Sequence, residues 1–70
     1  MEFRLKTDFI ELDNLLKTMG FAVNGTQARE QIQSSQIKVN GAVENRIRRK
    51  LRLGDTVEFK TEKIEIIKNE

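Results

Sequence analysis

Neither cysteine nor histidine occurs among the 70 residues of this chain. Their absence excludes a disulfide, a zinc site built from Cys and His ligands, a thiol nucleophile and a histidine acid–base pair. The acidic residues are scattered singly, so no carboxylate pair indicates acid–base chemistry or a metal cage. We therefore expect a protein that is not an enzyme and that needs neither a cofactor nor a metal.

Long apolar stretches are missing as well. No run of the sequence approaches the roughly 20 apolar residues that span a bilayer. Residues 1–6 interleave charges with apolar side chains, where a signal peptide needs an apolar run. We expect a cytoplasmic protein with no membrane association. A chain of this length makes one domain, residues 1–70, which buries only about 60% of the surface that its unfolded form exposes.

Positive charge is concentrated in one place. The formal net charge of +2 hides a balance of −1 over residues 1–45, +5 over residues 46–52 and −2 over residues 53–70. We call residues 46–52 the basic segment; its charged residues are Arg46, Arg48, Arg49, Lys50 and Arg52. Such a cluster makes a local field that a whole-chain average conceals.

Two helices are predicted in the first half of the chain. Asp8 and Glu11 have the spacing of a capping box, which predicts a helix that begins at Asp8 and carries an apolar stripe from Leu12 to Met19. Asn24 is expected to cap a second helix, and Gln27 completes that box. In the second helix, Ala28 and Ile32 lie one turn apart and should face inward.

Strand signals surround these helices. Residues 2–6 alternate between apolar and charged side chains, and residues 37–39 and 42–44 flank Asn40-Gly41, the strongest short-range hairpin signal. Leu51 and Leu53 alternate around Arg52, residues 56–59 alternate again after Gly54-Asp55, and a last strand follows a polar turn at Glu62-Lys63. The pattern predicts an α+β fold, with two helices packed on a small, mostly antiparallel sheet.

Phosphate binding is one interpretation of the basic segment. An arginine can grip a phosphate with two parallel hydrogen bonds, and Ile47 and Leu51 could hold the segment to the body of the protein. The other interpretation is a solvated loop that keeps the protein soluble, and charge alone does not separate the two. Arg29 and Lys38 are single basic residues that matter only if the fold brings them beside this segment.

Other modes of RNA binding fit the sequence poorly. The four Phe residues do not form the aromatic strand pattern that stacks bases in an RNA-recognition motif, and they are expected in the core. The stretch 25–28 lacks the second glycine of the loop that KH domains use.

An ordered set of motifs resembles a known family. The motifs are Leu12-Asp13-Asn14-Leu15-Leu16, Thr26-Gln27-Ala28-Arg29-Glu30-Gln31-Ile32, Ile37-Lys38-Val39-Asn40-Gly41 and Leu53-Gly54-Asp55-Thr56-Val57. In this order they resemble the RNA-binding domain first described in ribosomal small-subunit protein S-four. The resemblance covers about residues 8–59, and it is closer to the small stand-alone bacterial members of the YbcJ and YaaA kind.

The resemblance implies a ribosomal S-four-like RNA-binding fold whose RNA meets the second helix and the loop that follows the hairpin. Carried over by position, and with the rest of the basic segment included, the RNA contacts would be Arg29, Lys38, Arg46, Arg48, Arg49, Lys50 and Arg52. Many ribosomal members open the second helix with Ser-Arg, where this chain has Asn24-Gly25. One arginine contact is therefore absent, which implies a smaller footprint or one shifted toward Arg46–Lys50.

These observations predict a monomer that binds structured RNA, ribosomal or otherwise folded, by its backbone and shape. The ribosome and its subunits are candidate partners. The alternative is an adaptor that docks an acidic protein through the same basic segment.

Overall fold

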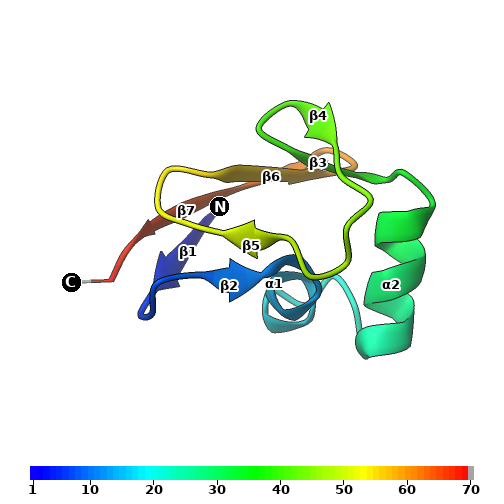
Figure 1. The fold of residues 1–70 in the computed structure, drawn as a ribbon, viewed down its shortest axis with the longest axis horizontal. Coiled ribbons are helices and arrows are strands. Elements are labelled where there is room, and N and C mark those ends of the chain that lie inside the picture. The colour runs from blue at the N-terminus through cyan, green and yellow to red at the C-terminus, as the bar shows by residue number, and fades with distance from the viewer. Residues whose placement is uncertain (70) are drawn as a thin grey trace.

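The computed structural model describes residues 1–69 as two helices and seven short strands (Figure 1). In chain order these elements are β1 (Glu2–Leu5), β2 (Ile10–Glu11), α1 (Leu12–Thr18), α2 (Gly25–Gln33), β3 (Ile37–Val39), β4 (Ala42–Val43), β5 (Lys50–Leu51), β6 (Thr56–Phe59) and β7 (Glu62–Lys68).

Within the described residues the strands form two sheets. The larger has the order β1-β7-β6-β3-β4, and the smaller pairs β2 with β5. The β1–β7 pair is parallel, whereas the other neighbours run antiparallel. The predicted α+β fold, with two helices on a mostly antiparallel sheet, is confirmed.

The Asn40-Gly41 turn joins β3 to β4 as predicted. Both residues have positive φ, 53° and 86°, as a type I′ turn requires, and Val39 pairs with Ala42 across it. The Asn40 side chain also makes hydrogen bonds to the Gly54-Asp55 turn, the next of the motifs named above. Its Nδ2 donates to the Asp55 carboxylate at 3.1 Å, and its Oδ1 accepts from the Thr56 amide at 2.9 Å. Two motifs 15 residues apart in sequence are thus one connected unit in space.

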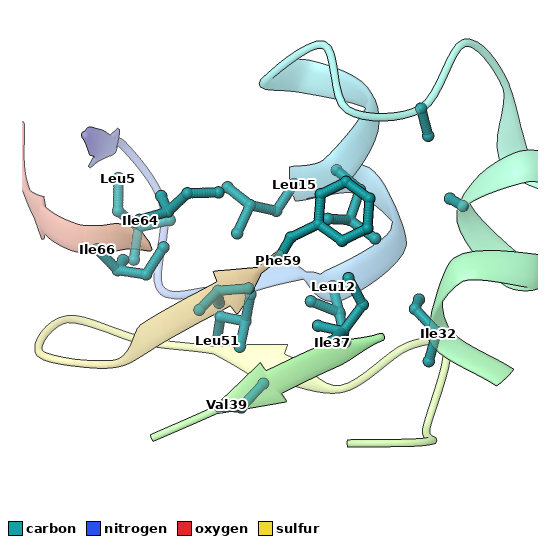
Figure 2. Close-up of a cluster of buried hydrophobic side chains, with 14 residues drawn as sticks. Leu5, Leu12, Leu15, Ile32, Ile37, Val39, Leu51, Phe59, Ile64 and Ile66 are labelled. Atoms are coloured by element: carbon teal, nitrogen blue, oxygen red, sulfur yellow. The ribbon is translucent and has the colours of Figure 1, made fainter. Parts of the chain in front are cut away.

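The core lies between the helices and one face of the larger sheet. The α1 residues Leu12, Leu15 and Leu16 are fully buried, as the apolar stripe predicted. Figure 2 shows the side chains from both helices and the strands gathered into one cluster. The buried hydrophobic residues are Leu5, Leu12, Leu15, Leu16, Ala22, Ala28, Ile32, Ile37, Val39, Leu51, Val57, Phe59, Ile64 and Ile66.

The start of the second helix follows the prediction closely. The Asn24 side chain accepts a hydrogen bond from the Gln27 amide at 2.8 Å, which is the expected N-cap. Gln27 reaches back to the Val23 amide at 2.7 Å, one residue before the cap position that a capping box would use.

The predicted start of the first helix at Asp8 is wrong. Helix α1 begins at Leu12, and its N-cap residue Glu11 makes no side-chain capping bond. Ile10 and Glu11 instead form β2, paired with Leu51 and Lys50. A capping box is a local pattern, and here pairing with a strand 40 residues away prevails over it.

Two smaller expectations also differ from the structure. Leu53 is not part of a strand, and its side chain is 54% exposed. The last hairpin turns at residues 60–61, because Phe59 pairs with Glu62 and Lys63 already lies in β7. Lys60 has a φ of 55°, so a lysine occupies the left-handed position that glycine usually fills.

Candidate nucleic-acid interface

The basic segment crosses the start of helix α1. The amides of Leu12 and Asp13 have no partner within the helix, and they donate to the carbonyls of Arg49 at 2.9 Å and Ile47 at 3.1 Å. The loop backbone therefore caps α1 in place of the side-chain cap that the sequence had suggested. The geometry of the basic segment and the start of the helix depend on each other.

Apolar contacts hold the same segment to the body of the protein. Leu51 is fully buried in the core, and Ile47 packs against the core cluster. Both anchors that the sequence predicted are thus confirmed. Beside α2, the side-chain Nδ2 of Asn45, the residue before the segment, donates to the Ile32 carbonyl at 3.4 Å. The cations between these anchors are carried on a fixed backbone.

Glu44 organises two of the arginines. Its side chain is 10% exposed, and its two oxygens accept four hydrogen bonds. The Arg46 amide and Nε each donate to Oε2 at 3.0 Å, while Arg46 Nη2 and Arg49 Nη1 donate to Oε1 at 3.1 and 2.6 Å. The side-chain hydrogen bond from Arg46 is the largest cause that lowers the pKa of Glu44, and the Arg46 backbone amide and Arg49 add to it. Burial of the carboxyl raises the pKa, but the hydrogen bonds outweigh it and the pKa falls to about 2.

This role of Glu44 was not predicted from the sequence, in which Glu44 belongs to the expected hairpin and the basic segment begins only at Arg46. The Glu44 amide donates to the Ile37 carbonyl, which puts the residue beside a buried strand position. The spacing Glu-x-Arg-x-x-Arg was visible in the sequence, but burial of the acid was not.

An open depression lies over the paired arginines. Its volume is about 420 Å³, and four basic residues line it: Arg46, Arg48, Arg49 and Lys50. Glu44 uses Nε and Nη2 of Arg46 and Nη1 of Arg49, so each guanidinium retains other N–H groups that can donate. The depression is suited to a multivalent anion such as a phosphate group.

Lys50 and Arg52 extend the positive surface past the depression. Lys50 Nζ lies 4.9 Å from the centre of the Phe9 ring, and the Arg52 guanidinium carbon lies 5.6 Å from it. Both are cation–π contacts, since each is within about 6 Å of the ring centroid. Phe9 was expected in the core; the structure places it half-buried beside two cations.

Arg29 and Lys38 occupy other places. Arg29 is exposed on α2, one turn before Ile32. The Ile32 carbonyl accepts a hydrogen bond from the side chain of Asn45, the residue that precedes the basic segment. Lys38 lies between buried Ile37 and Val39 on β3, so its position faces away from the core and the helices. The structure thus brings Arg46, Arg48, Arg49, Lys50 and Arg52 together, leaves Arg29 exposed on α2, and puts Lys38 on the face of the sheet that points away from the core.

In the part of the chain that the structure describes, no helix has the length and apolar character needed to cross a membrane. No group of three or more acidic, His or Cys side chains in that part could hold a metal ion.

Comparison with known proteins gives consistent matches. A model of the S4 domain family matches residues 3–67. YbcJ of Escherichia coli (strain K12), provisionally named an RNA-binding protein, is 40% identical over 62 residues, 89% of each chain. An uncharacterised YbcJ of Shigella flexneri matches to the same extent. A solution structure of YbcJ from E. coli, described as revealing an alfaL motif involved in RNA binding, has a TM-score of 0.72 at 40% identity and covers 94% of this chain and 85% of that one.

Proposed function

Since the chain belongs to the S4 domain family, we propose that it binds folded RNA through the phosphate backbone. The contact surface is the basic segment, with Arg48 and Lys50 as its most available cations and Arg46, Arg49 and Arg52 beside them. The match to a relative provisionally named as RNA-binding supports the class of ligand.

The observation that carries the proposal is the depression lined by four basic residues, two of which pair with the buried carboxylate of Glu44. Glu44 fixes the side chains of Arg46 and Arg49 before any ligand arrives, so less side-chain entropy is lost on binding. The two ion pairs also offset part of the repulsion among neighbouring cations. An anion that enters the depression meets N–H groups already in place.

The rigidity of the segment favours a ligand with fixed phosphate spacing. Backbone bonds to α1 and the burial of Leu51 fix the backbone from which the cations extend. A folded RNA presents phosphates at fixed separations, whereas a flexible acidic chain would have to be ordered on binding. Contacts of this kind position an RNA without reading its bases.

Several expectations accompany this proposal. Arg29 is kept as a peripheral contact, because Asn45, the residue before the basic segment, bonds to the Ile32 carbonyl of the same helix. Lys38 is left out of the surface, because its strand position faces the other way. That the protein is a monomer, acts in the cytoplasm, meets the ribosome and catalyses no reaction stays a prediction.

A binding comparison tests the proposal. A labelled RNA hairpin, a DNA duplex of the same length and an acidic polypeptide such as poly-glutamate are each titrated with the parent protein. We expect the RNA hairpin to bind most tightly. The double variant Arg48→Ala/Lys50→Ala should weaken RNA binding strongly. The matched control Lys38→Ala/Lys63→Ala removes the same charge from the outer face of the sheet and should change it little.

Two results would contradict the proposal. Tighter binding of poly-glutamate than of RNA would favour the protein-adaptor alternative. Equal loss of RNA affinity in the two double variants would mean that net charge alone attracts RNA.

A further inference from the structure

We propose that the groove beside Phe9 receives one unpaired nucleobase of an RNA held on the basic segment. This inference rests on the proposed function and adds a second kind of contact to it. The phosphate backbone would lie on the cations, and one base that is free of pairing would leave the helix and stack against the Phe9 ring.

The groove lies next to β1 and the turn into β2. Its volume is about 350 Å³, toward the lower end of the roughly 300–1,000 Å³ typical of small-ligand sites. Its apolar lining comes from Phe3, Leu5, Phe9 and Ile10, and Thr7 adds a hydroxyl. That hydroxyl donates to the Phe9 carbonyl at 2.7 Å, which fixes the turn carrying the aromatic ring.

Phe9 lies outside the hydrophobic core, unlike the apolar residues that line the groove with it. Among residues 1–69, Phe3 and Ile10 pack against the core cluster, whereas Phe9 does not. The ring is half-buried, and the cations of Lys50 and Arg52 lie over it. An aromatic ring placed outside the core and next to basic side chains is the arrangement with which proteins stack bases of unpaired nucleic acid.

The charges around the groove select a nucleotide over a neutral apolar ligand. Arg4 and Lys6 belong to its lining, and Lys50 and Arg52 contact the ring of Phe9, one of its lining residues. Asp8 is the acid that lies between Thr7 and Phe9 in the sequence, so cations predominate. A nucleotide combines a flat apolar face with a negative phosphate, and both parts find a complement here.

Continuity with the basic depression identifies the nucleotide as part of a larger RNA. Lys50 lines the depression, and its Nζ lies 4.9 Å from the centre of the Phe9 ring, which lines the groove, so a single contact links the two sites. A strand with its phosphates over Arg48 and Lys50 would pass directly beside Phe9. The occupant we infer is therefore an extrahelical base of the bound RNA, such as a bulged nucleotide.

The experiment compares two RNA hairpins with the same stem, one fully paired and one with a single bulged adenosine. The parent protein should bind the bulged hairpin about tenfold more tightly, the order expected for one base stacked on an aromatic ring. Phe9→Leu keeps an apolar side chain but removes the π-face, and it should bind both hairpins equally. Phe9→Tyr should retain the preference. Circular dichroism and thermal melting confirm that the variants are folded.

Failure of this inference is distinguishable from failure of the proposed function. If the parent binds both hairpins equally, or if Phe9→Leu keeps the preference, the base site is refuted while RNA binding stands. If the parent binds neither hairpin, both proposals fall. Competition with a short acidic peptide containing Phe is a further arm. The peptide and the unlabelled bulged hairpin are each used as competitors of the labelled bulged hairpin. If the peptide displaces the labelled RNA at lower concentrations than the unlabelled RNA does, the groove is assigned to a protein partner instead.

Discussion

Replacing Glu44 with Gln should lower the free energy of unfolding by about 1–2 kcal/mol at neutral pH. Gln keeps the shape of the side chain but removes the charge that Arg46 and Arg49 contact at 3.0 and 2.6 Å. The drop in pKa from 4.5 to about 2 would correspond to roughly 3 kcal/mol, at about 1.4 kcal/mol for each pKa unit. Because the Arg46 side chain is 72% exposed, solvent screens part of this interaction. We therefore expect a loss of about 1–2 kcal/mol and not the full value.

The stability that Glu44 contributes should decrease as the pH falls. The pKa of Glu44 is lower in the folded chain than in the unfolded one, so the unfolded chain binds more protons between the two values. The stabilisation by Glu44 is complete above its unfolded pKa of about 4.5 and is lost as the pH falls toward about 2. Glu44→Gln lacks this component. The gap in stability between parent and variant should therefore shrink by more than half between pH 7 and pH 3.

Urea unfolding followed by circular dichroism, at pH 7, 5 and 3 and constant ionic strength, measures this gap. Glu62→Gln is the matched control, since it removes one charge from an exposed position of β7. The free energy of unfolding of Glu62→Gln should differ little from that of the parent at pH 7. If Glu44→Gln is as stable as the parent at pH 7, or if the gap is unchanged at pH 3, Glu44 does not organise the arginines as described.

Two further predictions concern the fold. Leu15→Ala truncates a fully buried side chain and should cost about 2–5 kcal/mol, measured by urea unfolding; a change in melting temperature below about 1 °C would contradict its place in the core. Gly41→Val should destabilise by backbone strain alone, of order 1–3 kcal/mol, because φ is 86° and an added Cβ meets nothing within 4 Å. Gly25→Ala, which also adds a Cβ in open space but at a φ outside the left-handed region, is the control and should be neutral or slightly stabilising.

Local signals in the sequence predicted much of the fold. The Asn40-Gly41 turn, the Asn24 cap and the stripe of Leu12, Leu15 and Leu16 each depend on residues within one turn or one hairpin. Their outcomes follow from neighbouring residues, so a sequence can reveal them. The order of motifs also predicted the family correctly.

The errors arose where distant segments meet. Helix α1 starts late because Ile10 and Glu11 pair with Leu51 and Lys50, and because a loop supplies the carbonyls that cap the helix. The burial of Glu44 depends likewise on the strand beside it and on two arginines that fold back. Phe9 was assigned to the core from its type, although its surroundings are set by cations more than 40 residues away.

The salt dependence of RNA binding tests the central claim most directly. If the basic segment meets about four phosphates, the logarithm of the association constant should fall with the logarithm of salt concentration at a slope near −3 to −4, at roughly 0.7–0.9 for each phosphate. Arg48→Ala and Lys50→Ala should each flatten that slope by about one unit, and the double variant by about two, for every RNA sequence tested. A folded double variant that keeps the affinity and the slope of the parent would show that RNA does not bind at the basic segment.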